Sequence, residues 1–189
     1  PWIWGVDLPA GTGKWANEYL NQPGAVGNQV KACRFIRQFG RWTIYANILD
    51  GSGVRHHKRV QWALIDTLGD LSAGINMNLY DGDGEITGLE IIGERCFVFF
   101  SNKAYEMIQT GDPNSPFSFR SVPLLSGIKL PRSVANFDSY VIYVGNDNVY
   151  LFDGAQAVPV GAPITDFIED AITIDTSGLS VMSASLRSQ

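Results

Sequence analysis

Three carboxylates stand at every second position in one glycine-rich stretch of this chain, at Asp81, Asp83 and Glu85. Hard cations such as calcium prefer several oxygen ligands from a flexible loop, so this spacing can supply part of a calcium site. The complete twelve-residue calcium loop is absent, because no bidentate acid follows at the required distance. A tight turn before a strand explains the Asp-Gly pairs equally well. We therefore predict no metal site, and these three residues are the candidates that a metal would use.

A second stretch concentrates positive charge in a chain whose formal net charge is −5, and it contains Arg55, His56, His57, Lys58 and Arg59. Adjacent histidines on a strand point to opposite faces, so they do not easily hold one metal ion. The run can be a solvated strand start, a contact for an acidic patch on a neighbouring subunit, or a contact for DNA phosphate. We treat all five residues as interface candidates.

Signatures of catalysis are missing from the sequence. Residues 11–14 resemble a phosphate-binding loop, but Trp15 occupies the position of the Ser or Thr that this motif requires. No Gly-x-Ser-x-Gly nucleophile elbow occurs. A fold can bring distant Asp and Glu residues together as a glycosidase pair, but no pair stands out. We predict that the protein is not an enzyme and that it uses no cofactor.

Composition is typical of a sheet-rich globular protein. The 189 residues are 45% hydrophobic and 12% aromatic, whereas only 17% are charged. Sheets favour aromatic residues, and low charge beside many aromatics indicates that a neighbour covers part of the surface. The acidic net charge argues against a basic surface that binds nucleic acid. A mildly acidic surface could instead line a passage through which DNA moves without binding.

The cysteines argue against a disulfide-stabilised protein, and the short apolar runs argue against a helix that spans a membrane. Cys33 and Cys96 lie in apolar strand patterns and are expected to be buried thiols, not a disulfide framework. No apolar run is long enough to span a bilayer, and no signal peptide is visible. Because the chain starts at Pro1 without an initiator Met, we expect it to be part of a longer polypeptide.

Short aromatic strands recur at intervals of roughly 50 residues, as they do in propeller blades and related sheet arrays. Each follows a Gly or Asp turn, and the three repeats lie at residues 41–45, 95–100 and 140–144. Alternate positions of such strands face the core. We therefore expect their aromatic side chains to fill the space between sheets, and the alternative is that some of them stack on sugar rings.

These repeats lie among further strands, which predict an all-β fold of four-stranded antiparallel meander units arranged as a β-propeller or part of one. We also expect two short helical segments, at residues 66–71 and 165–170. The predicted strands are residues 30–39, 41–49, 59–64, 85–92, 95–100, 103–108, 117–122, 132–137, 140–144, 148–152 and 156–160.

The chain divides on this basis into three segments. Residues 1–29 form an irregular segment in which Trp2, Trp4 and Trp15 are anchors and interface candidates. Residues 30–163 hold about three blade-like units. Residues 164–189 form a short helix and an extended connector.

Three segments, taken in order, carry a resemblance to a known family. The first is the basic run leading into a Val-x-Trp strand at residues 55–62, and the second is Gly-Glu-Ile-Thr-Gly-Leu at 84–89, before an aromatic strand and Ala-Tyr-Glu-Met-Ile at 104–108. The third is Val-Tyr-Leu-Phe-Asp-Gly at 149–154, followed by Val-Pro-Val-Gly at 158–161. Together they resemble the β-propeller-like tail nozzle proteins of short-tailed bacteriophages, also called tail tubular or stabilisation proteins.

The resemblance covers residues 30–170 and consists of turns and aromatic strands, not of a catalytic signature. Ala63 and Ala104 stand where the family has Ser, and Val160 stands where it has Ile. These replacements keep size and polarity near enough for packing.

The resemblance implies a structural virion protein located in the phage tail. Such a subunit assembles with copies of itself into a six-fold ring around the channel used for DNA ejection. It docks tail adaptor and fibre proteins, while genome DNA passes without specific binding. The alternative function is a β-propeller module that binds a carbohydrate or a host receptor.

Overall fold

The computed structural model of the chain describes residues 2–4, 15–17, 29–63, 71, 76–82, 84–124, 126–131 and 133–161. These residues are all-β, which confirms the predicted fold class. The chain divides into two compact units, Pro1–Tyr80 and Asp81–Gln189, and each is described by itself. The predicted helical segment at 66–71 lies outside the described residues except for Leu71, and the segment at 165–170 lies outside them entirely. The predicted segment boundaries after residues 29 and 163 stay predictions.

The first unit begins with a small two-stranded ladder. Strand β1 (Trp2–Trp4) pairs antiparallel with β2 (Trp15–Asn17), and Trp4 lies opposite Trp15 in the register. The segment that was expected to be irregular therefore includes one short pair of strands.

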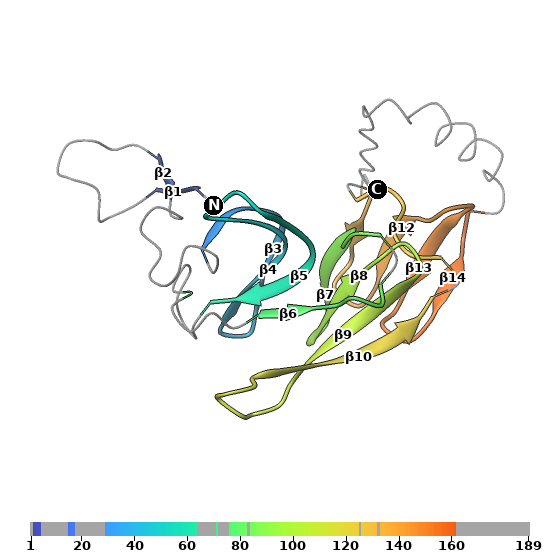
Figure 1. Cartoon of the computed structure of the whole chain (residues 1–189). Coiled ribbons are helices and arrows are strands. Elements are labelled where there is room, and N and C mark those ends of the chain that lie inside the picture. Colours follow the sequence, from blue (N-terminus) through green and yellow to red (C-terminus); the bar gives the residue numbers. More distant parts are fainter. Residues whose placement is uncertain are drawn as a thin grey trace. The chain divides into compact units, whose positions relative to one another are not determined.

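A four-stranded antiparallel sheet forms the main body of the first unit, in the order β3-β4-β5-β6 (Figure 1). Its central strand β4 is buried along almost its whole length, because apolar residues occupy both of its faces. A bulge at Asn47, whose φ is 55°, interrupts the pairing of β4 with β5. The strands are β3 (Val30–Phe39), β4 (Trp42–Asp50), β5 (Arg55–Trp62) and β6 (Asn76–Asn78).

The basic run belongs to this sheet. The strand expected at residues 59–64 begins instead at Arg55, because the register continues past the bulge and pairs Ile48 with His56. Backbone N–H and C=O groups form this ladder whatever side chains they carry, so the charged residues did not prevent strand formation.

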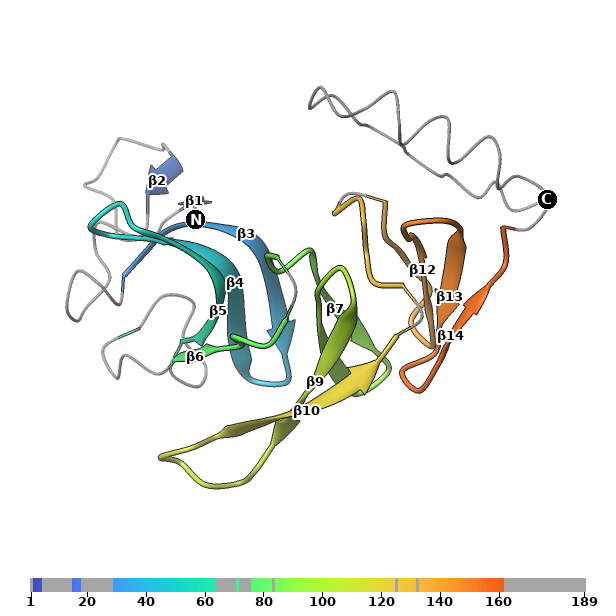
Figure 2. The same cartoon turned by 45° about the vertical axis from the view of Figure 1, so that its right-hand side comes forward.

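The second unit contains two meanders, as predicted. The first is a sheet in the order β10-β9-β8-β7, and the hairpin of β9 and β10 extends beyond β8 (Figures 1 and 2). Residues 85–87 are not part of β7, although they were expected in it. The strands are β7 (Gly88–Ile92), β8 (Arg95–Phe99), β9 (Lys103–Gln109) and β10 (Phe117–Pro123).

The second meander is a sheet in the order β11-β12-β13-β14. Its first strand is shorter than the expected 132–137, because the hydroxyl of Ser133, not a backbone carbonyl, accepts the N–H of Val144 at 3.1 Å. The strands are β11 (Ala135–Asn136), β12 (Val141–Val144), β13 (Val149–Phe152) and β14 (Ala157–Pro159).

The two meanders pack face to face through aromatic rings. Phe152 meets Phe97 and Phe99 edge to face, with ring centroids 5.1 and 5.5 Å apart, and Phe99 lies 6.0 Å from Tyr143. These four side chains are fully buried. The expectation that aromatic residues fill the space between sheets is therefore confirmed here, whereas closure into a propeller stays a prediction.

Candidate functional site

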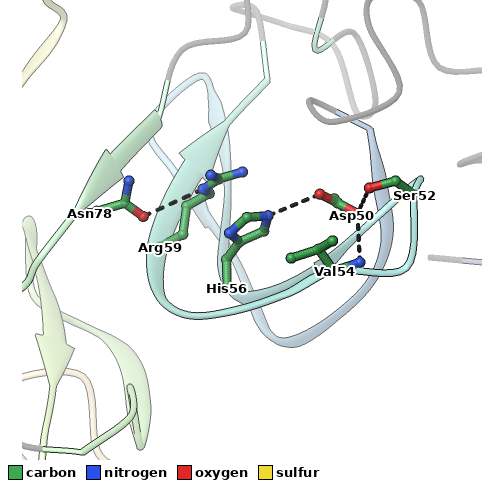
Figure 3. Close-up of polar contacts among 6 residues, drawn as sticks. All are labelled: Asp50, Ser52, Val54, His56, Arg59 and Asn78. Carbon is green, nitrogen blue, oxygen red and sulfur yellow. Dashed lines mark hydrogen bonds and ion pairs between the residues drawn. The ribbon is translucent and has the colours of Figure 1, made fainter.

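A polar cluster of the first unit surrounds Asp50, the last residue of β4. Its side chain is only 5% exposed. One carboxylate oxygen, Oδ1, accepts hydrogen bonds from the hydroxyl of Ser52 at 2.6 Å and from the backbone N–H of Val54 at 2.8 Å. The other, Oδ2, lies 2.9 Å from Nε2 of His56 (Figure 3). One carboxylate thus organises the whole β4–β5 turn.

Electrostatics keep this carboxylate charged. Burial alone would raise the pKa of Asp50, but hydrogen bonds from Ser52, His56 and Val54 outweigh burial and bring the pKa well below its ordinary value. Ser52 donates to the carboxylate and not to the imidazole, so the order of groups differs from a Ser-His-Asp triad. Among the described residues, the only base shown at the hydroxyl of Ser52 is the Asp50 carboxylate, whose lowered pKa makes it a weak proton acceptor, so this cluster does not activate Ser52 as a histidine would.

The remaining basic residues are engaged with their own unit. Arg55 donates to the backbone carbonyl of Asn47 at 2.9 Å, and so holds the bulge of β4. Lys58 Nζ donates to the carbonyl of Tyr80 at 3.2 Å. Figure 3 shows that Arg59 Nε points to the amide oxygen of Asn78 on the edge strand β6, at 3.5 Å.

The two histidines lie on opposite faces of β5, as predicted. His56 is partly buried and His57 is exposed. The five basic residues therefore stand on one strand, but they do not form one cluster of free charges. Their role as an interface stays a prediction.

A carboxylate that the sequence reasoning missed lies across three strands of the second unit. Glu106 on β9 is 8% exposed and accepts a hydrogen bond from Arg95 Nε on β8 at 2.6 Å. Its other oxygen accepts a hydrogen bond from Arg120 on the edge strand β10. The guanidinium of Arg95 also lies over the ring of Phe97, 4.9 Å from its centroid.

This pairing changes the acidity of both partners. The hydrogen bond from Arg95, with help from Arg120, lowers the pKa of Glu106 despite its burial. The same bond raises the pKa of Arg95. The sequence carried only part of a signal for this site, because Arg95 and Phe97 are two residues apart on one strand and share a face. The register that places Glu106 opposite Phe97 comes from the structure.

A further buried acid joins the two sheets of the second unit. The side-chain amide of Asn136 on β11 donates to Glu90 Oε2 on β7 at 3.2 Å and to the carbonyl of Ile91 at 2.7 Å. The backbone N–H of Gly93 donates to the carbonyl of Asp138 nearby. These contacts hold the first strand of one meander beside the first strand of the other.

The candidate metal ligands do not converge in the part of the chain that can be tested. Asp83 lies outside the described residues. The carboxylate of Asp81 accepts hydrogen bonds from the hydroxyl of Tyr105 and, at 3.3 Å, from Lys103 Nζ, and these bonds lower its pKa. Glu85 is partly buried. Among the described residues, no group of three or more His, Cys, Asp or Glu side chains could hold a metal ion.

The other predicted residues have mixed outcomes. Trp2, Trp4 and Trp15 lie in the β1–β2 ladder, and their interface role stays a prediction. Cys96 is a fully buried free thiol, as expected, whereas Cys33 on the edge strand β3 is only partly buried. Burial nevertheless raises the pKa of the Cys33 thiol. In the described ranges, no helix has the length and apolar character needed to cross a membrane.

Comparison with known proteins adds no family to this picture. No protein-family model matches the chain, and no curated protein is similar to it at a significant level.

Proposed function

We propose that this chain is a structural component of a bacteriophage tail, a nozzle subunit that assembles into a ring around the DNA exit channel. The observation that supports this most is the packing of two successive four-stranded meanders through a buried layer of aromatic rings. Repeated sheets stacked in this way make a stiff body whose outer strands and turns remain available for neighbours. The tail role itself comes from the resemblance noted in the sequence.

The polar clusters are consistent with this role. The charged groups of Asp50, Glu106 and Arg95 take part in hydrogen bonds and ion pairs that stabilise turns and sheets. The net charge of −5 suits a wall that DNA passes without sticking, because phosphates are repelled by a mildly acidic surface. Tail adaptor and fibre proteins are the further partners that we propose for such a subunit.

Particle imaging of the full-length protein tests the proposal. We expect rings with a central hole, with a six-fold repeat as the resemblance implies. A protein that stays a single copy at every concentration contradicts the ring and the proposed function with it.

A glycan array separates this proposal from the alternative of a carbohydrate- or receptor-binding module. A tail-wall subunit is expected to bind none of the arrayed sugars. Specific binding that is lost when the stacked pair Phe137 and Tyr140 is replaced by Ala would favour the alternative, because these half-buried rings are 5.1 Å apart on a turn.

A further inference from the structure

The loop that joins β9 to β10 contains the only Asp-Pro peptide bond in the sequence, between Asp112 and Pro113. Residues 111–115 of this loop are all exposed. A peptide bond between Asp and Pro is unusually labile in acid. The Asp carboxylate can attack its own main-chain carbonyl carbon, and the Pro nitrogen belongs to a tertiary amide, which accepts a proton more readily than the nitrogen of other residues. The groups that such a cleavage needs therefore lie side by side in an exposed loop.

Backbone donors of the same loop hold both reacting groups. Residues 112–115 form a β-turn with Asp first and Pro second, which are the positions that these residue types favour. The N–H of Ser115 donates to the main-chain carbonyl oxygen of Asp112 at 3.2 Å, and this carbonyl belongs to the labile bond. The N–H of Asn114 donates to Oδ1 of Asp112 at 2.9 Å. One donor thus polarises the carbonyl that is attacked, and the other positions the attacking carboxylate.

The base of the loop is closed by further contacts. The N–H of Thr110 donates to the carbonyl oxygen of Pro116 at 2.9 Å, and the hydroxyl of Thr110 donates to the carbonyl oxygen of Ser115. Next to these contacts, β9 and β10 pair along their whole lengths, starting from Gln109 opposite Phe117. A break within the turn would therefore leave both new chain ends attached to the same sheet.

We propose that the bond between Asp112 and Pro113 is a self-cleavage site that opens in acid. A carboxylate oxygen of Asp112 forms a bond to the main-chain carbonyl carbon of the same residue, and the C–N bond to Pro113 breaks. The proline nitrogen takes a proton from the acidic solvent and leaves as a secondary amine. Water then opens the cyclic anhydride and restores both carboxyl groups of Asp112, so one water molecule is consumed in total. The product is two chains that remain paired through β9 and β10.

Mass spectrometry of the unmodified protein tests this site, after incubation at the lowest pH at which circular dichroism still shows the folded protein. We expect one fragment that ends at Asp112 and one that begins at Pro113, and their formation should slow as the pH is raised to 7. Asp112→Glu and Pro113→Ala should each lose these fragments. Glutamate keeps the charge but must close a larger ring, whereas alanine keeps the carboxylate beside a less basic nitrogen. The other Asp-containing bonds of the same sample are the internal control.

The folded turn is expected to speed the reaction. Urea at the same pH removes the hydrogen bonds from Asn114 and Ser115, so the fragments should form more slowly there. Gel filtration without urea should elute the two fragments together. A folded protein that is cut no faster than the urea-unfolded protein overturns the inference, and so does equal cleavage of Asp112→Glu or Pro113→Ala. Fragments that separate without urea also overturn it, because the product would then not be a single paired sheet.

Discussion

At the scale of single residues, the polar groups of this protein act mainly on its own backbone. The carboxylate of Asp50 shows this most clearly, since it accepts a backbone N–H, a hydroxyl and an imidazole within one turn. A buried acceptor with several donors is costly to remove, because each donor loses its partner inside the protein.

Replacing Asp50 by Asn is expected to lower the free energy of unfolding at pH 7 by about 1–3 kcal/mol. The amide keeps one oxygen for Ser52 and Val54 but loses the negative charge that faces His56. Urea unfolding measures the change. Asp112→Asn is the control, because Asp112 lies on an exposed loop and accepts only a hydrogen bond that Asn can also accept. Equal losses in the two variants would contradict the role given to Asp50.

The stability that Asp50 contributes is expected to disappear in acid. Its pKa is lowered in the folded protein, so the contribution is complete above the unfolded value of about 4 and is lost as the pH falls toward the folded pKa. Urea unfolding at pH 5 and pH 2.5 should therefore show a smaller pH dependence for Asp50→Asn than for the unmodified protein. If the free energy of unfolding changed equally between pH 5 and pH 2.5 in both proteins, the folded state would not lower the pKa of Asp50.

At the scale of strands and sheets, Glu106 joins three neighbouring strands through two arginines. The carboxylate of Glu106 is buried, whereas the side chain of Arg120 is 63% exposed. Glu106 and Arg120 are therefore expected to contribute differently to the free energy of unfolding. A buried charge that loses its partner is destabilising, whereas an exposed partner contributes little.

We expect Glu106→Gln to lower the free energy of unfolding by about 1–3 kcal/mol, because the buried amide loses the charge-assisted hydrogen bond from Arg95, whose own side chain is 39% exposed. Arg120→Gln should cost less than about 1 kcal/mol, because water screens the exposed end. Chemical denaturation of both variants gives the comparison. A larger loss for Arg120→Gln than for Glu106→Gln would mean that Arg120 on the edge strand β10, and not the buried acid, contributes most of the stability of this contact.

The same scale explains which parts of the sheets could be predicted. The meander of β7–β10 follows from alternating apolar residues and short turns, and three of its strands begin at the residues expected. The start of β5 was missed because a charged run resembles a loop when side chains alone are considered. Its backbone pairs with β4 all the same, and that pairing depends on a strand elsewhere in the chain.

At the scale of the whole molecule, a buried aromatic contact holds the two meanders of the second unit together. Phe152 lies at its centre, fully buried between Phe97 and Phe99. Removing a buried ring deletes apolar contacts and leaves a cavity, so both sheets lose support together.

Phe152→Ala is expected to lower the free energy of unfolding by about 3–5 kcal/mol. Phe137→Ala, on a half-buried turn, should cost less than half as much, because solvent already reaches that ring. Thermal and urea unfolding of the two variants test this difference. A small effect of Phe152→Ala would mean that the two sheets do not depend on each other.

What the sequence determined by itself is the all-β class, the order of the meanders and the burial of their aromatic strands. These properties depend on side-chain alternation and on turns, both of which are encoded within a few neighbouring residues. The partners of the charged residues were decided only by the tertiary structure. Asp50 and His56 meet because a turn folds back, whereas Glu106, Arg95 and Arg120 meet because strand register aligns positions that are distant in the chain. Register depends on the pairing of whole strands, so no local pattern contains it.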